Sequence, residues 1–317
     1  MDSWLVTGAA GYIGSQVSRH LLQSGYNVIA LDNLSHGHVM NLPKEIQFLE
    51  CDVRNYAGLR QALSGVLGVV HLAGYKFASL SETYPEQAFS NNVEGTETLI
   101  KAMVDSQCQN LIFSSSCAIY GSPSNLPVTE DHPKDPLSPY ALSKLKAEQA
   151  IESSELNFVN LRFFNVVGSG PDLIEDHSDF NLFPIILNSW EQDKVAQIRG
   201  RDYETPDGTA VRDYIHVTDI AEAHLRSIEL LLRSKVLRKS YNLAGGNGFS
   251  VLQVMKEFKE VLGESFNFEY GDRRSGDPAS IYGSSTLAEL ELGWEVKKTL
   301  REMVESSVAA RKKRLNF

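Results

Sequence analysis

WLVTGAAGYIG, residues 4–14, combines a short apolar strand, a turn with three glycines and the start of a helix. Glycines let the backbone turn sharply and approach a pyrophosphate closely, and the free N–H groups of a helix N-terminus attract its negative charge. Gly8, Gly11 and Gly14 have the spacing G-x-x-G-x-x-G rather than the tighter G-x-G-x-x-G. The turn alone is therefore a weak indication of a dinucleotide site. The residues around it decide whether this interpretation holds.

The residues after the turn strengthen this interpretation. A helix is predicted over about 13–24, and Asn27–Leu31 is the next apolar strand, with Asp32 at its end. A carboxylate at that position accepts hydrogen bonds from the ribose diol of adenosine. Because Asn33 follows instead of an arginine, nothing local favours a 2′-phosphate, and we expect NAD rather than NADP.

Strands and helices alternate through the first half of the chain. Further apolar strands are predicted at 46–51, 68–72, 110–113 and 158–161, and helices at 85–105 and 139–153. Strands that alternate with helices of about 10–15 residues indicate βαβ units and a parallel sheet, and apolar strands indicate helices on both faces. We therefore predict an α/β fold with a Rossmann-type, doubly wound parallel sheet.

The pattern changes after Arg162, and residues 168–208 are rich in loop-forming residues. We predict a Rossmann domain for NAD over residues 1–166. A smaller C-terminal substrate-binding lobe follows over residues 167–317, and part of it, about 210–235, packs back on the first domain.

Composition and charge exclude several classes of protein. The 317 residues are 42% hydrophobic and 22% charged, which is typical of a soluble globular protein. A net charge of -10 repels nucleic acids and anionic membranes, so we expect neither as a partner. No apolar run reaches about 18 residues, the length of a membrane span. Cys51, Cys108 and Cys117 lie far apart without metal-ligand spacing, which indicates a reducing compartment, the cytoplasm, and no cysteine metal site.

Two runs of charged residues also need an interpretation. Glu175-Asp176-His177 with Asp179 resembles a metal cluster, but we interpret it as a mobile acidic loop, and we expect no metal. The basic run Arg311–Arg314 is interpreted as a solvated helix end.

A tyrosine and a lysine follow the fifth predicted strand. Tyr140 and Lys144 are four residues apart, so on the helix 139–153 they share one face. A free phenol has a pKa of about 10, which is too high for a base at neutral pH. The lysine ammonium and an oxidised nicotinamide are both cationic, so we expect them to lower this pKa. Such pairs occur by chance, and it is the position at the sheet edge that makes this one informative.

Three serines, 114–116, directly follow the fifth predicted strand. Ligands of open α/β sheets bind at the carboxyl ends of the strands, so one of these hydroxyls can hydrogen-bond an alcohol or ketone oxygen beside Tyr140.

These features resemble the extended short-chain dehydrogenase/reductase family over nearly the full chain. The stretches that carry the resemblance are Val6–Gly14, Leu31–Leu34, Asn91–Thr96, Ser114–Gly121, Ser138–Tyr140, Arg162–Gly168 and Asp207–Val217. The last stretch is the most specific to the branch of the family that epimerises nucleotide sugars.

The resemblance implies a role for each site residue. Tyr140 is the acid/base, Lys144 is its pKa partner and also holds the nicotinamide ribose, and Ser116 hydrogen-bonds the sugar O4. The residues implied around a tightly bound NAD are Gly8, Gly11, Tyr12, Ile13, Gly14, Asp32, Asn33, Asp52, Val53, Leu72, Ala73, Gly74, Lys76, Asn91 and Phe164. Those implied around the nucleotide sugar, besides Ser116 and Tyr140, are Asn165, Asn181, Leu182, Arg199, Arg212, Arg274 and Asp277.

The implied reaction is redox-neutral. It inverts C4 of a UDP-hexose through a 4-keto sugar, interconverts UDP-glucose and UDP-galactose, and regenerates NAD in every turnover. Arg212 and Arg274 suit a diphosphate, because guanidinium groups match its charged oxygens. The family also pairs the helices at 85–105 and 139–153 across a dimer axis, so a homodimer is implied.

Some positions depart from the family pattern and leave alternatives open. Arg199 stands where an aromatic usually lies beside the uracil, and Ile281 is bulky where some relatives have a small residue, which favours substrates without an N-acetyl group. A 4-epimerase for UDP-N-acetylglucosamine or UDP-pentoses stays open, as does a non-catalytic protein that binds NAD and a nucleotide sugar. Dehydratases need an acid pair after the catalytic hydroxyl, and Cys117 and Ala118 cannot supply it.

Overall fold

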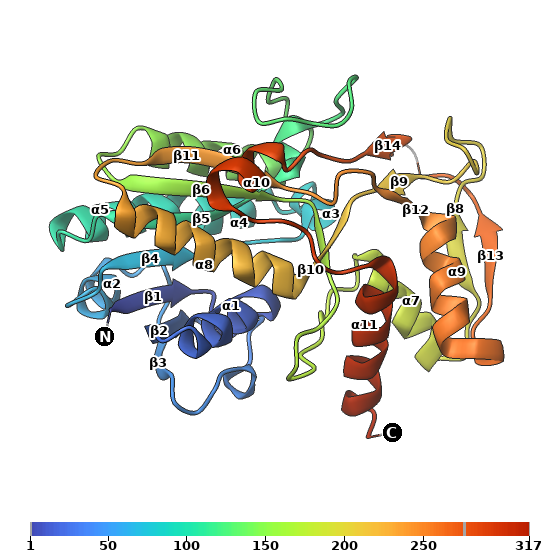
Figure 1. Cartoon of the computed structure of the whole chain (residues 1–317), viewed down its shortest axis with the longest axis horizontal. Helices are drawn as coiled ribbons and strands as arrows, with labels where there is room; N and C mark the ends of the chain where they lie inside the picture. The colour runs from blue at the N-terminus through green and yellow to red at the C-terminus, as the bar shows by residue number, and fades with distance from the viewer. Residues whose placement is uncertain (1, 275–276, 317) are drawn as a thin grey trace.

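A parallel sheet forms the centre of the computed structural model, which describes residues 2–274 and 277–316 (Figure 1). In spatial order its seven strands are β11 (Arg238–Leu243), β6 (Asn157–Phe163), β5 (Asn110–Ser116), β4 (Gly68–His71), β1 (Ser3–Thr7), β2 (Asn27–Asp32) and β3 (Gln47–Glu50). All neighbouring pairs in this sheet are parallel. The predicted Rossmann-type fold is confirmed, and the strand order reverses between β1 and β4, where such sheets bind ligands.

Helices cover both faces of this sheet. One face carries α1 (Tyr12–Gln23), α8 (Val217–Arg233) and α10 (Thr286–Leu292); the other carries α2 (Tyr56–Ala62), α5 (Gly95–Asp105) and α6 (Pro139–Glu152). Helix α8 packs along α1. Two further C-terminal elements, β11 and α10, also return to the sheet. Strand β11 was not predicted from the sequence, because the first half of Arg238–Leu243 is polar.

The helix predicted at 85–105 is divided. It consists of α4 (Pro85–Phe89), a π-helical segment (Ser90–Glu94) and α5, and the short α3 (Ala78–Ser81) precedes it. The wider π turn places Asn92 inside, where its side-chain amide donates to the Ser143 hydroxyl on α6 at 2.8 Å. Insertions of this kind are frequent at functional sites.

A smaller lobe lies at the carboxyl edge of the sheet, on the right in Figure 1. Its helices are α7 (Leu182–Glu191), α9 (Val251–Leu262) and α11 (Leu300–Arg314), and its strands are β8 (Ala196–Arg199), β9 (Val211–Arg212), β12 (Phe249–Ser250), β13 (Phe268–Gly271) and β14 (Ser280–Ile281). The strands β7 (Asn165–Val167) and β10 (Tyr214–His216) form a parallel pair between the lobe and the sheet, and the single-turn 3₁₀ helices are Val39–Asn41, Cys117–Tyr120 and Gly263–Ser265. The lobe has its own apolar core, which includes Phe183, Phe258 and Phe266.

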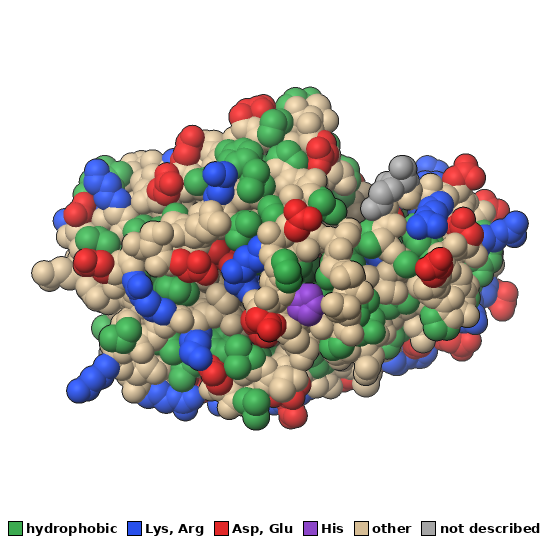
Figure 2. Space-filling view, turned by 90° about the horizontal axis from the view of Figure 1, so that it is seen from above, with side chains coloured by type: hydrophobic (Ala, Val, Ile, Leu, Met, Phe, Trp, Pro, Cys, Tyr) green, Lys and Arg blue, Asp and Glu red, His purple; other side chains and the backbone are tan. Residues whose placement is uncertain are grey.

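The surface carries both signs of charge. Figure 2 shows acidic and basic side chains interspersed on one face, with hydrophobic side chains between them. Among the helices of the described residues, none is both long enough and apolar enough to cross a bilayer.

A buried ion pair joins α6 to the sheet. Arg162 on β6 donates to both carboxylate oxygens of Glu148 at 3.0 and 2.8 Å, and also to the Tyr120 hydroxyl at 2.8 Å. Both charged side chains are almost fully buried. Such a pair is costly to break, because the remaining charge stays buried without a partner. It therefore fixes the position of α6, the helix that carries Tyr140 and Lys144.

We predict that Glu148→Gln lowers the free energy of unfolding by about 3–5 kcal/mol, because it leaves the Arg162 guanidinium without its counter-charge. Urea denaturation measures this loss. Glu152→Gln removes an exposed carboxylate from the same helix and is the control, for which we expect almost no change. Equal stabilities of the two variants would contradict this role of the ion pair.

Candidate functional site

A cavity of about 1090 Å³ lies between the sheet edge and the lobe. This volume is slightly above the usual range for small-molecule sites, about 300–1000 Å³. The residues expected around NAD that line it are Gly8, Gly11, Tyr12, Ile13, Gly14, Asp32, Asn33, Val53, Leu72, Ala73, Gly74, Lys76, Asn91 and Phe164. The remaining expected residues that line it are Ser116, Tyr140, Lys144, Asn165, Asn181, Leu182, Arg199, Arg212, Arg274 and Asp277. One cavity thus collects residues that are scattered from 8 to 277 in the sequence.

Asp52 is the exception. Its neighbours Cys51, Val53 and Arg54 line the cavity, but Asp52 does not. Its carboxylate accepts hydrogen bonds from Arg54 at 2.8 and 2.7 Å and from Asn33 at 2.9 Å. The Arg54 guanidinium holds the pKa of this carboxyl well below its usual range. In this structure Asp52 therefore positions two neighbouring side chains instead of facing the cavity.

The glycine turn forms one end of the cavity. Gly8 has a φ of +66°, and a Cβ atom there would lie 2.6 Å from the backbone nitrogen of Ala73. Helix α1 begins at Tyr12, and its N-cap residue Gly11 provides no side-chain cap, so N–H groups of the first turn stay available. A close backbone cradle at a helix N-terminus fits the pyrophosphate of a dinucleotide.

Asp32 closes the same turn from β2. Its carboxylate accepts the backbone N–H groups of Ala10 at 3.0 Å and Leu34 at 2.8 Å. A carboxylate has about four acceptor positions, so capacity remains for the two hydroxyls of a ribose. The residues present thus fit the adenosine half of NAD.

Tyr140 and Lys144 lie on one face of α6, as the spacing predicts. The Lys144 ammonium donates to the carbonyl oxygen of Ser114 at 2.9 Å and lies 4.9 Å from the centre of the Phe113 ring. Burial lowers the pKa of Lys144 to about 8, although the Glu148 carboxylate one turn further along opposes this shift. The side chain is thus a buried cation with one fixed hydrogen bond.

The pKa of Tyr140 corrects one expectation. Burial raises it to about 12, and a hydrogen bond with Ser116 only partly opposes the shift. The sequence predicts a pKa that is lowered by Lys144 together with an oxidised nicotinamide, whereas in the protein alone the loss of hydration dominates. The Ser116 hydroxyl caps the 3₁₀ turn after β5 by accepting the Ala118 N–H at 3.2 Å, and this turn keeps it beside the phenol.

The lobe side of the cavity depends on Asp213, a residue that the sequence did not single out. This buried carboxylate accepts three backbone N–H groups, from Gly245 at 2.6 Å, Gly246 at 3.3 Å and Gly283 at 3.2 Å. Its own carbonyl accepts the Asn165 side-chain amide at 2.7 Å. Burial raises the pKa of Asp213 to about 6. Asp213 thereby joins the loop after β11 and the segment after β14 to the chain next to Arg212. In the sequence, only its position after that arginine could have indicated this role.

Ile281 does not line the cavity. It packs against an apolar cluster that includes Ile119, Leu145 and Phe164. Arg199 does line the cavity, at the end of β8. The bulk of Ile281 therefore gives no direct reason to reject an N-acetyl group.

The acidic run corrects a second expectation, because part of it is buried and ion-paired. Glu175 pairs with Arg311 and Arg314, and Asp176 pairs with Lys76 at 3.1 Å. Arg311 is almost fully buried, so the basic run is not simply a solvated helix end. Among residues 2–274 and 277–316, no three His, Cys, Asp or Glu side chains converge as metal ligands would.

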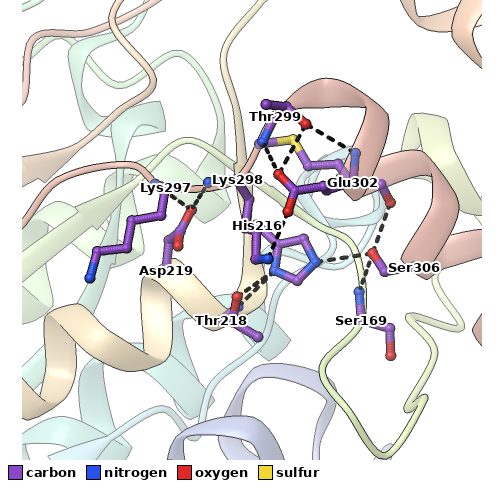
Figure 3. Close-up of polar contacts among 10 residues, drawn as sticks. Ser169, His216, Thr218, Asp219, Lys297, Lys298, Thr299, Glu302 and Ser306 are labelled. Atoms are coloured by element: carbon purple, nitrogen blue, oxygen red, sulfur yellow. Dashed lines mark hydrogen bonds and ion pairs between the residues drawn. The ribbon is translucent and has the colours of Figure 1, made fainter.

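A polar network ties the lobe to α8 (Figure 3). The backbone N–H of Thr218 donates to Nδ1 of His216 at 3.1 Å, so the Nε2–H donates to the Ser306 hydroxyl on α11 at 3.0 Å. That hydroxyl also accepts the Ser169 N–H at 3.1 Å. Burial, with a contribution from the Lys298 charge, lowers the pKa of His216 to about 4. Neutral His216 therefore joins α8, α11 and the loop after β7.

Sequence comparison gives the family and a close relative. The model of the NAD dependent epimerase/dehydratase family matches residues 4–244. A UDP-glucose 4-epimerase from Halalkalibacterium halodurans is 41% identical over 313 residues, which cover 95% of this chain and 93% of that protein.

Solved structures agree over the same length. The crystal structure of a UDP-glucose 4-epimerase from Stenotrophomonas maltophila with bound NAD and formylated UDP-arabinopyranose matches with a TM-score of 0.95 and 31% identity, over 100% of this chain and 99% of that chain. A UDP-glucose 4-epimerase from Bifidobacterium longum in complex with NAD+ and UDP matches with a TM-score of 0.88 and 34% identity, over 99% of each chain.

We predict that His216→Asn weakens the pH dependence of stability. The pKa of His216 is about 4 in the folded chain and near its ordinary 6.5 in the unfolded chain. The unfolded chain therefore binds more protons between these values, and stability is lost as the pH falls through this window. Asparagine retains a capping oxygen but does not titrate, so the slope should decrease by about 1.4 kcal/mol per pH unit. Urea denaturation from pH 4 to 7 measures how the free energy of unfolding changes with pH. The same slope in the variant and the wild type would show that His216 is not the linked group.

Proposed function

Because the chain belongs to the NAD dependent epimerase/dehydratase family, we propose that it inverts C4 of a UDP-hexose and interconverts UDP-glucose and UDP-galactose. The observation that carries this proposal is the convergence of Tyr140, Lys144 and Ser116 in one cavity with the glycine turn. Similarity to UDP-glucose 4-epimerases extends over nearly the whole chain, so both the dinucleotide end and the lobe have counterparts in them.

We assign the proton transfers to the residues at the sheet edge. When bound, NAD supplies the acceptor and donor of hydride, so the reaction consumes no external oxidant or reductant. Tyr140 takes the proton from O4 and returns it after the sugar has turned, while the Ser116 hydroxyl holds that oxygen. Lys144, fixed by the Ser114 carbonyl, stabilises the phenolate. The positive nicotinamide is the second charge that offsets the effect of burial on the phenol.

The binding energy comes from the nucleotide part of the substrate. Arg212 and Arg274 line the lobe side of the cavity, where their guanidinium groups suit the diphosphate. The hexose must present either face of C4 to the same groups, so it has to be held loosely. Tight binding of UDP with weak binding of the hexose retains the substrate and still lets the hexose rotate, because the contacts that hold UDP are remote from C4.

The assembly and compartment are further parts of the proposal. We propose a homodimer through the helical region 85–105, which comprises α4, the π-helical segment and α5, and through α6; α5 and α6 lie side by side on one face of the sheet. A monomeric mass in sedimentation equilibrium at micromolar protein would contradict it. We also propose that the chain works in the cytoplasm, which its free thiols Cys51, Cys108 and Cys117 support. Localisation of the tagged protein outside that compartment would contradict this part.

We predict that Tyr140→Phe loses turnover by several orders of magnitude but still binds NAD and UDP, because only the transferable proton is removed. The assay follows UDP-glucose formed from UDP-galactose without added NAD, with UDP-N-acetylgalactosamine and UDP-arabinose as further substrates. Tyr84→Phe removes an exposed hydroxyl and is the control. Turnover by Tyr140→Phe similar to that of the wild type would remove Tyr140 from the mechanism. A wild type that binds these ligands but converts none would favour the non-catalytic alternative.

We predict that Gly8→Ala abolishes retention of NAD, because its Cβ would collide with the backbone at Ala73. Gly25→Ala is a matched control: Gly25 also has a positive φ, +89°, but no atom lies within 4 Å of its Cβ position. The control should lose only about 1–2 kcal/mol of stability, the cost of a left-handed alanine. NAD content after gel filtration, read by absorbance, separates them. Equal NAD content would show that the turn does not hold the cofactor.

A further inference from the structure

Asp176 contacts both sides of the cavity. One carboxylate oxygen accepts the Lys76 ammonium at 3.1 Å, and the other accepts the Asn181 side-chain amide at 2.8 Å. Lys76 lies in the loop after β4, near the dinucleotide end, whereas Asn181 precedes α7 in the lobe. All three line the cavity. Asp176 is only 9% exposed and Lys76 is 46% exposed, so the carboxylate is the fixed member of the pair.

The segment that carries Asp176 is held by long-range contacts. Next to it, Glu175 is paired with Arg311 and Arg314 of α11. At the start of the same loop, the Ser169 N–H is held by Ser306, which His216 also contacts (Figure 3). The position of the Asp176 carboxylate is therefore determined by the lobe and by α11.

Besides its hydrogen bonds, the Asp176 carboxylate affects the cavity through its negative charge. Its surroundings must accept two anionic ligands, a dinucleotide and a nucleotide sugar, and an unpaired carboxylate would repel both. The Lys76 ammonium neutralises it. The Asp176 charge also reaches Tyr12 at the N-terminus of α1, since it acts with burial to raise the pKa of that phenol. Asp176 is thus electrostatically connected with the dinucleotide end, and it is hydrogen-bonded to the lobe.

We propose that Asp176 is a positioning residue that couples the NAD subsite to the nucleotide-sugar subsite. The proposal rests on the proposed function, which assigns Lys76 to NAD and Asn181 to the sugar nucleotide. A ligand that fixes Asn181 fixes the carboxylate, and the carboxylate then fixes Lys76 beside NAD. Coupling of this kind is reciprocal, so each ligand strengthens the binding of the other by the same factor. The residue needs no contact with the reacting atoms.

The test measures release of NAD from the holoprotein, with and without saturating UDP. We expect UDP to slow the release by about 10-fold in the wild type, within the usual range for coupled sites. In Asp176→Asn the ratio should fall towards one, because the neutral amide loses its attraction for Lys76. Asp179→Asn makes the same chemical change at an exposed position outside the cavity, and it should keep the ratio.

Three further variants separate positioning from general damage. Asn181→Ala removes the lobe-side partner of Asp176, and at a UDP concentration that saturates this variant it should lower the ratio. Lys76→Met should release NAD faster than the double variant Lys76→Met/Asp176→Asn, since the single change leaves an unpaired carboxylate beside the anionic ligand. That rescue is not expected if Asp176 only maintains the fold.

The outcomes are distinct. A wild-type ratio in Asp176→Asn, a ratio of one in the wild type, or no rescue in the double variant would overturn the coupling. A wild type that binds neither NAD nor UDP would instead overturn the proposed function. If Asp176→Asn does not fold, the ratio in Asn181→Ala decides.

Discussion

The hydrogen bond from the Lys144 ammonium to the carbonyl oxygen of Ser114 is the contact on which the site depends. It joins α6 to the end of β5 and places three groups together: a cation and a phenol from the helix, and the Ser116 hydroxyl from the strand. A buried ammonium without a partner would be costly, so the pairing of helix and strand is strongly determined. The Glu148–Arg162 ion pair secures the same helix two turns after Tyr140.

The electrostatics of the site are a compromise. Burial lowers the pKa of Lys144 to about 8 and raises that of Tyr140 to about 12, so the protein alone disfavours both charged forms. A phenolate forms readily only when further positive charge is close. This condition links proton transfer to the presence of an oxidised nicotinamide, and it keeps the phenol protonated at neutral pH when that charge is missing.

Features that depend on nearby residues were predictable from the sequence. The glycine turn, the strand that ends at Asp32 and the Tyr140–Lys144 face depend on spacing within one or two elements, and the resemblance to a known family placed the arginines of the lobe. Contacts between distant segments were not predictable. Asp176 reads as part of a loop, and its partner Lys76 is 100 residues away. From the sequence, Arg311 likewise belongs to a solvated helix end. In the structure it is buried and forms an ion pair with Glu175.

The most direct test uses UDP-galactose that carries deuterium at C4, incubated with the purified protein without added cofactor. In the proposed mechanism the hydrogen on C4 leaves and returns within one closed site, and the proton of O4 moves separately. We therefore expect UDP-glucose that retains the deuterium at C4, as measured by NMR. Loss of the deuterium to water during conversion would contradict the account.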